Sequence, residues 1–389
     1  MALAAFAALS GCGGGGGKAA GTEGGPCLTN LTCNTGLTCA SSLCVSLSGT
    51  GGAGGNAGAG AQAGAGGQAG SGSAGAGVVG GGAAGASGQA GAGDQAPSSY
   101  TIHWGPTQIP AATEDTQCVV VRLGNVPAIH VGQIHSQLGA GTVQMILYAV
   151  TATTEQTNPF DCAPFTSVYQ ASQMVGMTPL TVVQNPDETL TFPTGVGVAL
   201  AANQMMRVEL HYANQSATAP MTAQATVTLS TMPDAAFQSA ASFLTVAETG
   251  FSIQAAATLT EGPTFFPFPS TFVGAKFFAV TSEQHQWGTE AQIWSAISAA
   301  DAGNLVYHNT NWSTPPLTEN AAQAVTSGEG FKYQCDWNNT GNVGVSFGLS
   351  ASQELCLIVG YYYPSQGPVT CFHSGGSFAC CPGGGGVCN

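Results

Sequence analysis

Residues 331–364 read FKYQCDWNNTGNVGVSFGLSASQELCLIVGYYYP. Apolar and polar side chains alternate through FKYQCDW, and ELCLIVGYYYP contains a short continuous apolar run. The Asn- and Gly-rich segment NNTGN that follows the first run is typical of a turn. Alternation over a few residues, bounded by turn-forming residues and without a helical period, predicts β-strands.

The same pattern begins at Tyr100. Short apolar or alternating runs such as VQMILYAV, MMRVELHYAN and AKFFAVTS are separated by turn segments such as NPDET and TSGEG. Many short strands at even spacing predict an all-β protein, in the form of a sandwich, a barrel or a jelly roll. A break near MPDAAFQSAASF, residues 232–243, divides the region into similar halves, which we place at 99–235 and 236–366. The Cys- and Gly-rich segment 367–389 follows, and we expect a tail that is cross-linked by disulfides.

The residues before position 99 have a different composition. Most of the 57 glycines of the 389-residue chain lie there, in segments such as GGAGGNAGAGAQAGAGGQAG that have no large apolar side chain to bury. Such segments cannot offset the entropy cost of ordering, so we expect disordered linkers at 13–26 and 45–98. Between them, residues 27–44 read CLTNLTCNTGLTCASSLC. Four cysteines without a histidine or a C-x-x-C pair predict a small disulfide knot in preference to a zinc knuckle.

The first twelve residues resemble the end of a bacterial lipoprotein signal peptide. The apolar run LAAFAALSG ends at Cys12, and a Gly-rich tether follows it directly. A basic region before the apolar run is missing, and a chance stretch of small residues is the alternative. The lipoprotein interpretation predicts an acylated Cys12 and a location on the bacterial cell surface, at the outer membrane or facing the periplasm. Twelve further cysteines, an even number, suit disulfides in an oxidising compartment.

The charge balance excludes two classes of partner. Only 6% of the residues are charged, and the formal net charge is −14 with five lysines and arginines in total. Nucleic-acid binding needs clustered basic side chains, and an anionic membrane surface repels an acidic protein. We therefore expect no nucleic-acid partner, and contact with a membrane only through the lipid anchor at Cys12.

Histidine spacing gives no compact metal motif. The only close pair is His130 and His135 in HVGQIH, and a spacing of five places them on opposite faces of a regular strand unless a bulge intervenes. His285 lies in SEQHQWG, two residues after Glu283. The chain contains no G-x-S-x-G elbow, and its carboxylates are too sparse to suggest a glycosidase pair.

The stretch 331–364 resembles the C-terminal domain of the copper type II, ascorbate-dependent monooxygenases, which include peptidylglycine α-hydroxylating monooxygenase and dopamine β-monooxygenase. In that family a D-E-M-C loop leads into a YYP-like strand, where this chain has QELC and then YYYP. SEQHQWG (282–288) is similar to the family's H-x-H-x-x-G segment, and RVELHYAN (207–214) to its V-H-Y segment. DTQCVVVRL followed by TVQMILY (142–148) is similar to its Y-x-C-M strand followed by H-H-M-L-L-F. The resemblance covers residues 100–366.

This resemblance implies two tandem jelly-roll-like β-sandwich domains that face each other across a solvent cleft, each with a copper ion. One copper activates O2 and inserts oxygen into a C–H bond, and the other delivers an electron from ascorbate. Neutral imidazoles and a thioether suit copper in such sites. The six ligand positions of the family fall on Val143, Gln144 and His211 in the first half and on Glu283, His285 and Leu355 in the second.

Only two of these six positions, His211 and His285, keep the family's ligand. Glu283 offers a carboxylate, but valine and leucine cannot bind copper. The resemblance therefore predicts a catalytically degenerate relative. His211, His285 and Glu283 are its only metal-binding candidates, and copper is a cofactor only if the chain is active.

The resemblance also implies disulfides Cys118–Cys162 and Cys335–Cys356. The family's substrate-anchoring arginine and tyrosine fall on Thr281 and Val359, so a peptide carboxylate is not expected to bind as in the peptide enzyme.

Three functions are compatible with the sequence. In the first, a surface lipoprotein has lost catalysis, and its body binds a small molecule or a surface partner in the old cleft. In the second, the chain is an active copper monooxygenase with rearranged ligands, to which His130 or His135 contributes from a neighbouring strand. In the third, the protein is a structural or adhesive surface protein.

Overall fold

The computed structural model describes residues 34–35, 38–40, 43–45, 98–165 and 176–382. The chain divides into two compact units, residues 1–85 and 86–389. In the first unit, β1 (Thr38–Ala40) and β2 (Leu43–Val45) form an antiparallel hairpin in which Cys39 lies opposite Cys44. The acylation site predicted at Cys12, the linker 13–26, most of the segment 27–44 and most of the linker 45–98 lie outside the described residues.

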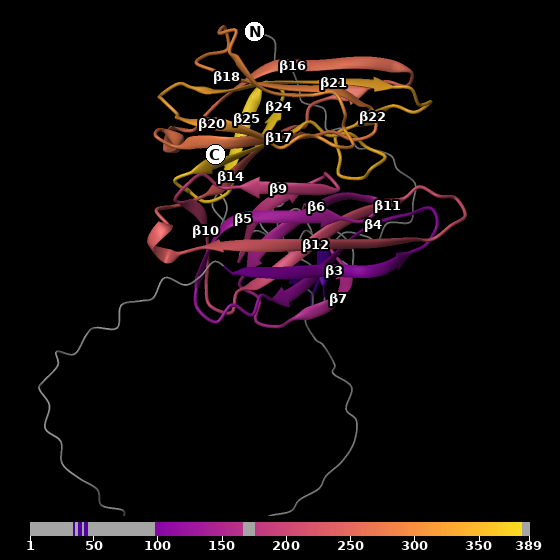
Figure 1. Ribbon diagram of the computed structural model, residues 1–389. Helices are drawn as coiled ribbons and strands as arrows, with labels where there is room; N and C mark the ends of the chain where they lie inside the picture. Colours follow the sequence, from indigo (N-terminus) through magenta and orange to yellow (C-terminus); the bar gives the residue numbers. More distant parts are fainter. Residues whose placement is uncertain (1–33, 36–37, 41–42, 46–97, 166–175, 383–389) are drawn as a thin grey trace, which may run out of the picture. The chain divides into compact units, whose positions relative to one another are not determined.

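Two sheets form the first sandwich of the second unit (Figure 1). Its strands are β3 (Ser99–Ile109), β4 (Thr113–Arg122), β5 (Ile129–Leu138), β6 (Thr142–Val150), β7 (Gln156–Asp161), β8 (Met177–Val183), β9 (Asp187–Thr191), β10 (Val196–Leu200), β11 (Met205–Asn214), β12 (Met221–Met232) and β13 (Ser239–Ala240). One sheet has the order β13-β10-β5-β12-β3, with β9 also paired to β5, and the other has the order β7-β4-β11-β6-β8.

The second sandwich follows directly in the chain. Its strands are β14 (Ser242–Glu248), β15 (Ser252–Ile253), β16 (Ala257–Pro267), β17 (Lys276–Glu283), β18 (Gly288–Ala296), β19 (Asn304–Asn309), β20 (Thr318–Ala324), β21 (Gly330–Asn339), β22 (Val345–Ser346), β23 (Leu357–Tyr363), β24 (Val369–Ser374) and β25 (Ser377–Pro382). The sheets have the orders β20-β17-β23-β14-β24-β25 and β16-β21-β18-β19, and β15 pairs with β22. Strands β24 and β25 thus extend a sheet of this sandwich into the segment 367–389 that the sequence analysis treats as a tail.

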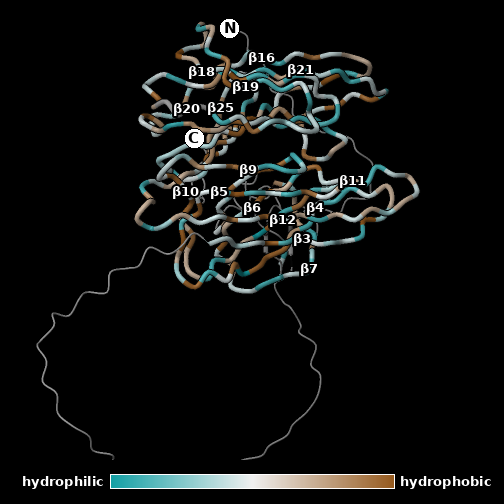
Figure 2. The backbone as a smooth tube through the Cα atoms, in the orientation of Figure 1, coloured by the Kyte–Doolittle hydropathy of each residue, from teal (hydrophilic) through white to brown (hydrophobic). Residues whose placement is uncertain are grey.

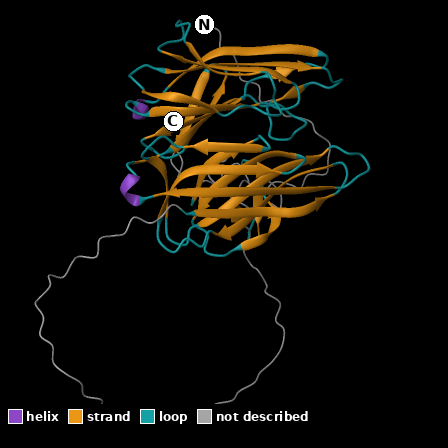
Figure 3. Ribbon diagram, in the orientation of Figure 1, coloured by secondary structure: helices purple, strands orange, loops and turns teal. Residues whose placement is uncertain are grey.

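The prediction of an all-β fold with two tandem jelly-roll-like sandwiches is confirmed (Figure 3). In the part of the chain that the structure describes, the only helices are the short 3-10 turns η2 (Asp234–Ala236) and η3 (Ser270–Phe272). None of the helices among these residues has the length and apolar character needed to cross a membrane.

Strand β21 explains why the stretch quoted first has its alternating pattern. The side chains of Phe331, Tyr333, Cys335 and Trp337 are buried, whereas the three residues between them are partly exposed. Successive side chains of a strand point to opposite faces, so one face of β21 packs into the core and the other faces solvent. Figure 2 shows hydrophobic and hydrophilic residues interspersed along the strands in the same way.

Strands β14, β17 and β23 differ because both of their faces are buried. In β23, Leu357, Val359 and Tyr361 belong to an apolar core that is continuous with the first sandwich. Ile358 and Tyr362 belong to the core inside the second sandwich. This explains the continuous apolar run LIVGYYY, because a strand that is covered on both faces needs apolar side chains pointing to each face.

The apolar part of the junction between the sandwiches is therefore filled by packed side chains. The resemblance to the copper monooxygenases implied a solvent cleft between two domains, whereas the described residues show a packed apolar core with pockets of about 290 and 370 Å³ beside it, each lined by residues of both sandwiches. Phe243, Ala247 and Phe278 of the second sandwich join the same core cluster as Met145 and Leu147 of the first. Apolar surface of this kind is stable only when it is removed from water.

Candidate functional site at the junction of the sandwiches

His285 lies in the short loop between β17 and β18, and its side chain is buried with 2% exposure. Its Nδ1 donates a hydrogen bond to the carbonyl oxygen of Gln353 (2.9 Å). Burial, with a smaller contribution from the nearby His211, lowers the pKa of His285 to about 4. The ring is therefore neutral at pH 7, and Nε2 is its bare acceptor nitrogen. Among the described residues, Nε2 has no hydrogen-bond partner.

Glu283, the last residue of β17, is buried beside this loop. Its Oε2 accepts a hydrogen bond from Nε2 of Gln144 (3.1 Å), which is a residue of β6 in the first sandwich. Burial raises the pKa of Glu283 well above its usual range, and a hydrogen bond from Gln184 offsets only part of this rise. The protonated, uncharged form is therefore favoured. Oε1 of Glu283 also lacks a partner within the described part of the chain.

His211 lies on β11, where it is paired in register with Gln144 of β6. Its Nε2 bonds Oε1 of Glu114 on β4 (3.0 Å), and the imidazole is buried with 4% exposure. Glu114 also accepts a hydrogen bond from the backbone N–H of Ala351 in the second sandwich (2.7 Å). The hydrogen bond from His211 is the largest cause of the low pKa of Glu114, about 2. Glu114 is therefore a carboxylate that ties β11 to the second sandwich.

These residues come close together, but they do not assemble a copper site. Across the described ranges, only one group of three His, Cys, Asp or Glu side chains brings its donor atoms within 4.8 Å of one another, namely Cys118, Cys162 and Glu209. Cys118 and Cys162 are joined to each other in a disulfide, so this group does not hold a metal. Around His211 and His285, one imidazole nitrogen is engaged by Glu114 and another by Gln353.

The other family ligand positions are occupied by side chains that pack. Leu355 is fully buried in the core at the junction, and Val143 is half-buried. Thr281 and Val359, at the substrate-anchoring positions of the family, are buried as well. The donor set that remains lacks the imidazoles and the thioether that copper in both redox states requires. The residues present therefore do not fit a pair of copper ions.

His130 and His135 do not supply the missing ligands. A bulge in the pairing of β5 with β12 shifts the register between them, and the neighbouring Ile129, Val131, Ile134 and Ser136 are buried. The two half-buried histidines consequently share the outer face of β5, in spite of their odd spacing. His130 bonds Asp234 (2.9 Å) and His135 bonds Asp187 (2.8 Å). They lie in the sheet opposite the one that carries His211.

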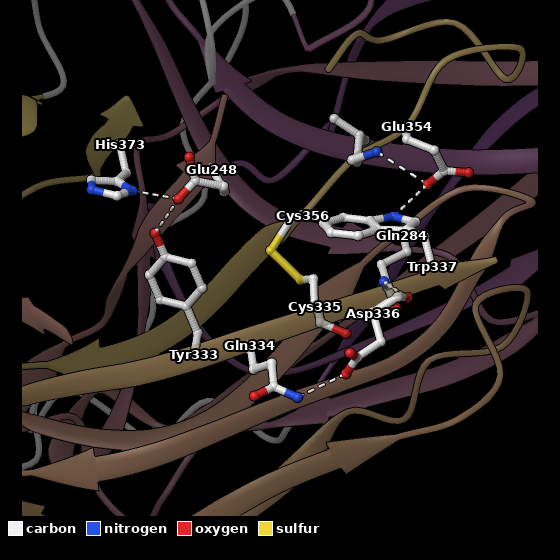
Figure 4. The surroundings of a disulfide bond; sticks show 12 residues. Glu248, Gln284, Tyr333, Gln334, Cys335, Asp336, Trp337, Glu354, Cys356 and His373 are labelled. Atoms are coloured by element: carbon white, nitrogen blue, oxygen red, sulfur yellow. Dashed lines mark hydrogen bonds and ion pairs between the residues drawn. A yellow bond between two sulfur atoms is a disulfide. The ribbon is translucent and has the colours of Figure 1, made fainter. Parts of the chain in front are cut away.

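Disulfides hold the strands around the junction. Cys118–Cys162 and Cys335–Cys356 are both formed, as the resemblance implied, and Cys371–Cys380 joins β24 to β25. Figure 4 shows Cys335–Cys356 with Trp337, whose Nε1 donates to Glu354 (3.0 Å).

The carboxyl group of Glu354 fixes the backbone of the loop that contains His285. It also accepts hydrogen bonds from the backbone N–H groups of His285 (3.0 Å) and Trp287 (2.7 Å). Burial nevertheless raises the pKa of Glu354 to about 7. Sequence reasoning missed this role, although the residue precedes the Leu355 that occupies the family's methionine position.

A second buried polar cluster lies on the other side of the Cys335–Cys356 disulfide (Figure 4). The hydroxyl of Tyr333 donates to Oε2 of Glu248 (3.1 Å), and Nδ1 of His373 bonds the same oxygen. Burial raises the pKa of Tyr333, so the phenol remains a donor. No motif around these three residues indicated the cluster, because strands distant in the sequence bring them together.

Comparisons with known proteins identify no family. No family model matches the chain, and no curated protein is significantly similar to it. The major capsid protein P2 from bacteriophage PM2 is a similar solved structure at 9% identity and a TM-score of 0.28, over 70% of this chain and 100% of that chain. The infectious bursal disease virus VP2 subviral particle matches at 9% identity and a TM-score of 0.17, over 70% of this chain and 77% of that chain. Likenesses this distant carry no argument about function.

Proposed function

We propose that this chain is a non-catalytic binding protein displayed on a bacterial surface, with a body related to the copper type II, ascorbate-dependent monooxygenases. The observation that carries the proposal is the state of the six family ligand positions. Four hold other side chains, and the two remaining imidazoles each have a nitrogen engaged by Glu114 or by Gln353. A copper pair that cycles between redox states has too few soft donors here.

The filled junction supports the same proposal. Oxygen insertion needs a substrate beside the metal, but Leu355 and Val359 lie in a continuous apolar core at the positions where the family binds metal and substrate. Burial lowers the pKa of His285 to about 4 and raises the pKa of Glu283, so it disfavours the charged form of both side chains. A buried pair of this kind is a poor source of the negative charge that would stabilise a bound cation.

A binding role suits the rest of the molecule. Disulfides such as Cys118–Cys162 and Cys335–Cys356 cross-link the sandwiches, and the sequence before residue 99 has the composition of a long flexible tether. A cross-linked β body joined to Cys12 by such a sequence would present binding surfaces to the outside of a cell.

Oxygen uptake tests the loss of catalysis. The full-length protein would be loaded with copper(II), freed of loosely bound metal by gel filtration and supplied with ascorbate in an oxygen electrode. We expect uptake at the rate of buffer alone, and the same rate for a His211→Ala/His285→Ala variant. Uptake above this background that the double substitution abolishes would show that the chain retains copper redox chemistry.

Metabolic labelling tests the anchor separately. In a bacterial host given a clickable palmitate analogue, the chain should become labelled and fractionate with membranes, whereas Cys12→Ser should be unlabelled. Equal labelling of both chains, or none in either, would remove Cys12 as the anchor.

A further inference from the structure

A pocket of about 390 Å³ opens at one end of the second sandwich. It lies between the ends of β17 and β20 in one sheet and the ends of β18, β19 and β21 in the other. Pockets that bind small molecules commonly have volumes of about 300–1,000 Å³ and an apolar lining with a few polar groups. This pocket is separate from the candidate site at the junction, since His211, Glu283, His285 and Glu354 do not line it.

Aromatic rings form the interior of this pocket. Phe268 stacks on Phe277 at 4.7 Å between ring centroids and meets Phe331 edge-on at 4.8 Å. Phe268 and Phe277 are only partly buried, although they pack against the core of the sandwich. Val280, Val306 and Val325 are among the further apolar residues that line the pocket. The exposed faces of these rings offer a surface for a flat apolar group and for a cation placed above a ring.

Two carboxylates stand among the polar lining residues. The backbone N–H groups of Ile297 (3.0 Å) and Gly303 (3.2 Å) donate to Asp301 and are the main cause of its lowered pKa, so the group stays ionised. Glu329 accepts one hydrogen bond at Oε2 from the N–H of Thr326 (2.6 Å). Lys332 donates to the backbone oxygen of Asp301 (2.7 Å) but does not line the pocket.

We propose that this pocket binds a small organic cation with an aromatic or apolar body, the body on the phenylalanine rings and the ammonium group beside Asp301 and Glu329. Complementarity of charge selects this class, because two carboxylates meet the ligand without a cation in the lining. The formal net charge of −14 favours the approach of a cation from solution as well. The inference deepens the proposed binding role and rests on it.

The test is a ligand-observed NMR titration of the full-length protein with three probes of one shape, 4-phenylbutylammonium, 4-phenylbutanol and 4-phenylbutanoate. We expect the affinity to fall in that order. Glu329→Gln keeps the side-chain oxygen that accepts a hydrogen bond from Thr326. It should weaken binding of the ammonium probe by about two- to fivefold, the range for a partly exposed ion pair. The same substitution should leave the alcohol unchanged, and Glu290→Gln on β18 is the matched control.

A steric variant tests the location. Val306→Phe on β19 fills the pocket and should abolish binding of the ammonium and the alcohol, whereas Leu305→Phe, at the adjacent exposed position, should leave both intact. Equal affinity for the carboxylate probe, or binding that survives Val306→Phe, would overturn the proposal. Either result would leave the oxygen-uptake test unaffected, so failure of this pocket is distinguishable from failure of the proposed function.

Discussion

Glu188 on β9 and Glu354 beside the His285 loop are buried carboxyl groups, and burial raises the pKa of each from 4.5 to about 7. A raised pKa means that the folded state binds the proton more tightly than the unfolded state does. The resulting stabilisation is complete below pH 4.5 and is lost as the pH rises through 7. Glu114 acts in the opposite direction, because its lowered pKa of about 2 gives a contribution that is lost as the pH falls below 4.5. We therefore expect the highest stability in weak acid.

The substitution Glu188→Gln tests the contribution of one buried carboxyl group to this pH dependence of stability. Oε2 of Glu188 accepts from Nδ2 of Asn185 (2.6 Å), an interaction that the amide oxygen of glutamine retains. Removing the ionisable group should raise the free energy of unfolding at pH 8 by about 1–3 kcal/mol and leave it almost unchanged at pH 4.5, since one pKa unit corresponds to about 1.4 kcal/mol. Chemical denaturation at both pH values measures the difference, with the exposed Glu319→Gln as control. A loss of stability at pH 8 would refute the assignment.

Disulfides cross-link strands of the body across chain segments of different lengths. Cys118–Cys162 spans 44 residues, Cys335–Cys356 spans 21 and Cys371–Cys380 spans 9. A cross-link stabilises mainly by restricting the unfolded chain, and its effect grows with the loop that it closes.

Paired Cys→Ala substitutions should therefore destabilise the body by about 4, 3 and 2.5 kcal/mol respectively. Denaturant melts of the three double variants, with the wild-type chain as reference, measure this order. A reversed order would mean that native-state contacts around the disulfides outweigh the loop-closure entropy.

The elements also show how far the sequence can be interpreted. The alternation in FKYQCDW predicted a strand with one buried face, and β21 has that face. The bulge in β5 that places His130 and His135 on the same face was not predictable, because it depends on the partner strand β12. The double burial of β23 was visible only as an apolar run, which does not say what covers the second face.

The candidate site was predictable in part. His285 and Glu283 were found because they stand two residues apart in a segment that resembles a metal motif. Glu114 was missed, because its partners His211 and Ala351 are distant in the sequence and only the packing of the sandwiches brings them to it. The pocket at the end of the second sandwich had no signal either, since it is formed by the ends of five strands.

For the whole molecule, a core shared through β14, β17 and β23 predicts that the two sandwiches unfold together. Separating them would break the contact of Phe192 in the first sandwich with Phe278 in the second and expose Leu357, Val359 and Tyr361. Such exposure costs free energy in proportion to apolar area. Calorimetry should show one transition whose calorimetric and van't Hoff enthalpies agree. Two resolved transitions would mean that the junction contributes little to stability.

We propose that this chain does not hold the copper ions of the monooxygenases that it resembles, and the copper-to-chain ratio measures this. The full-length protein would be produced in an oxidising compartment, incubated with copper(II) and ascorbate, passed through gel filtration and analysed for copper by elemental analysis. We expect a ratio near zero that His211→Ala leaves unchanged. A ratio of two would show that both copper sites are retained. A ratio of one that His211→Ala or His285→Ala abolishes would show that the sandwich carrying that histidine retains its site.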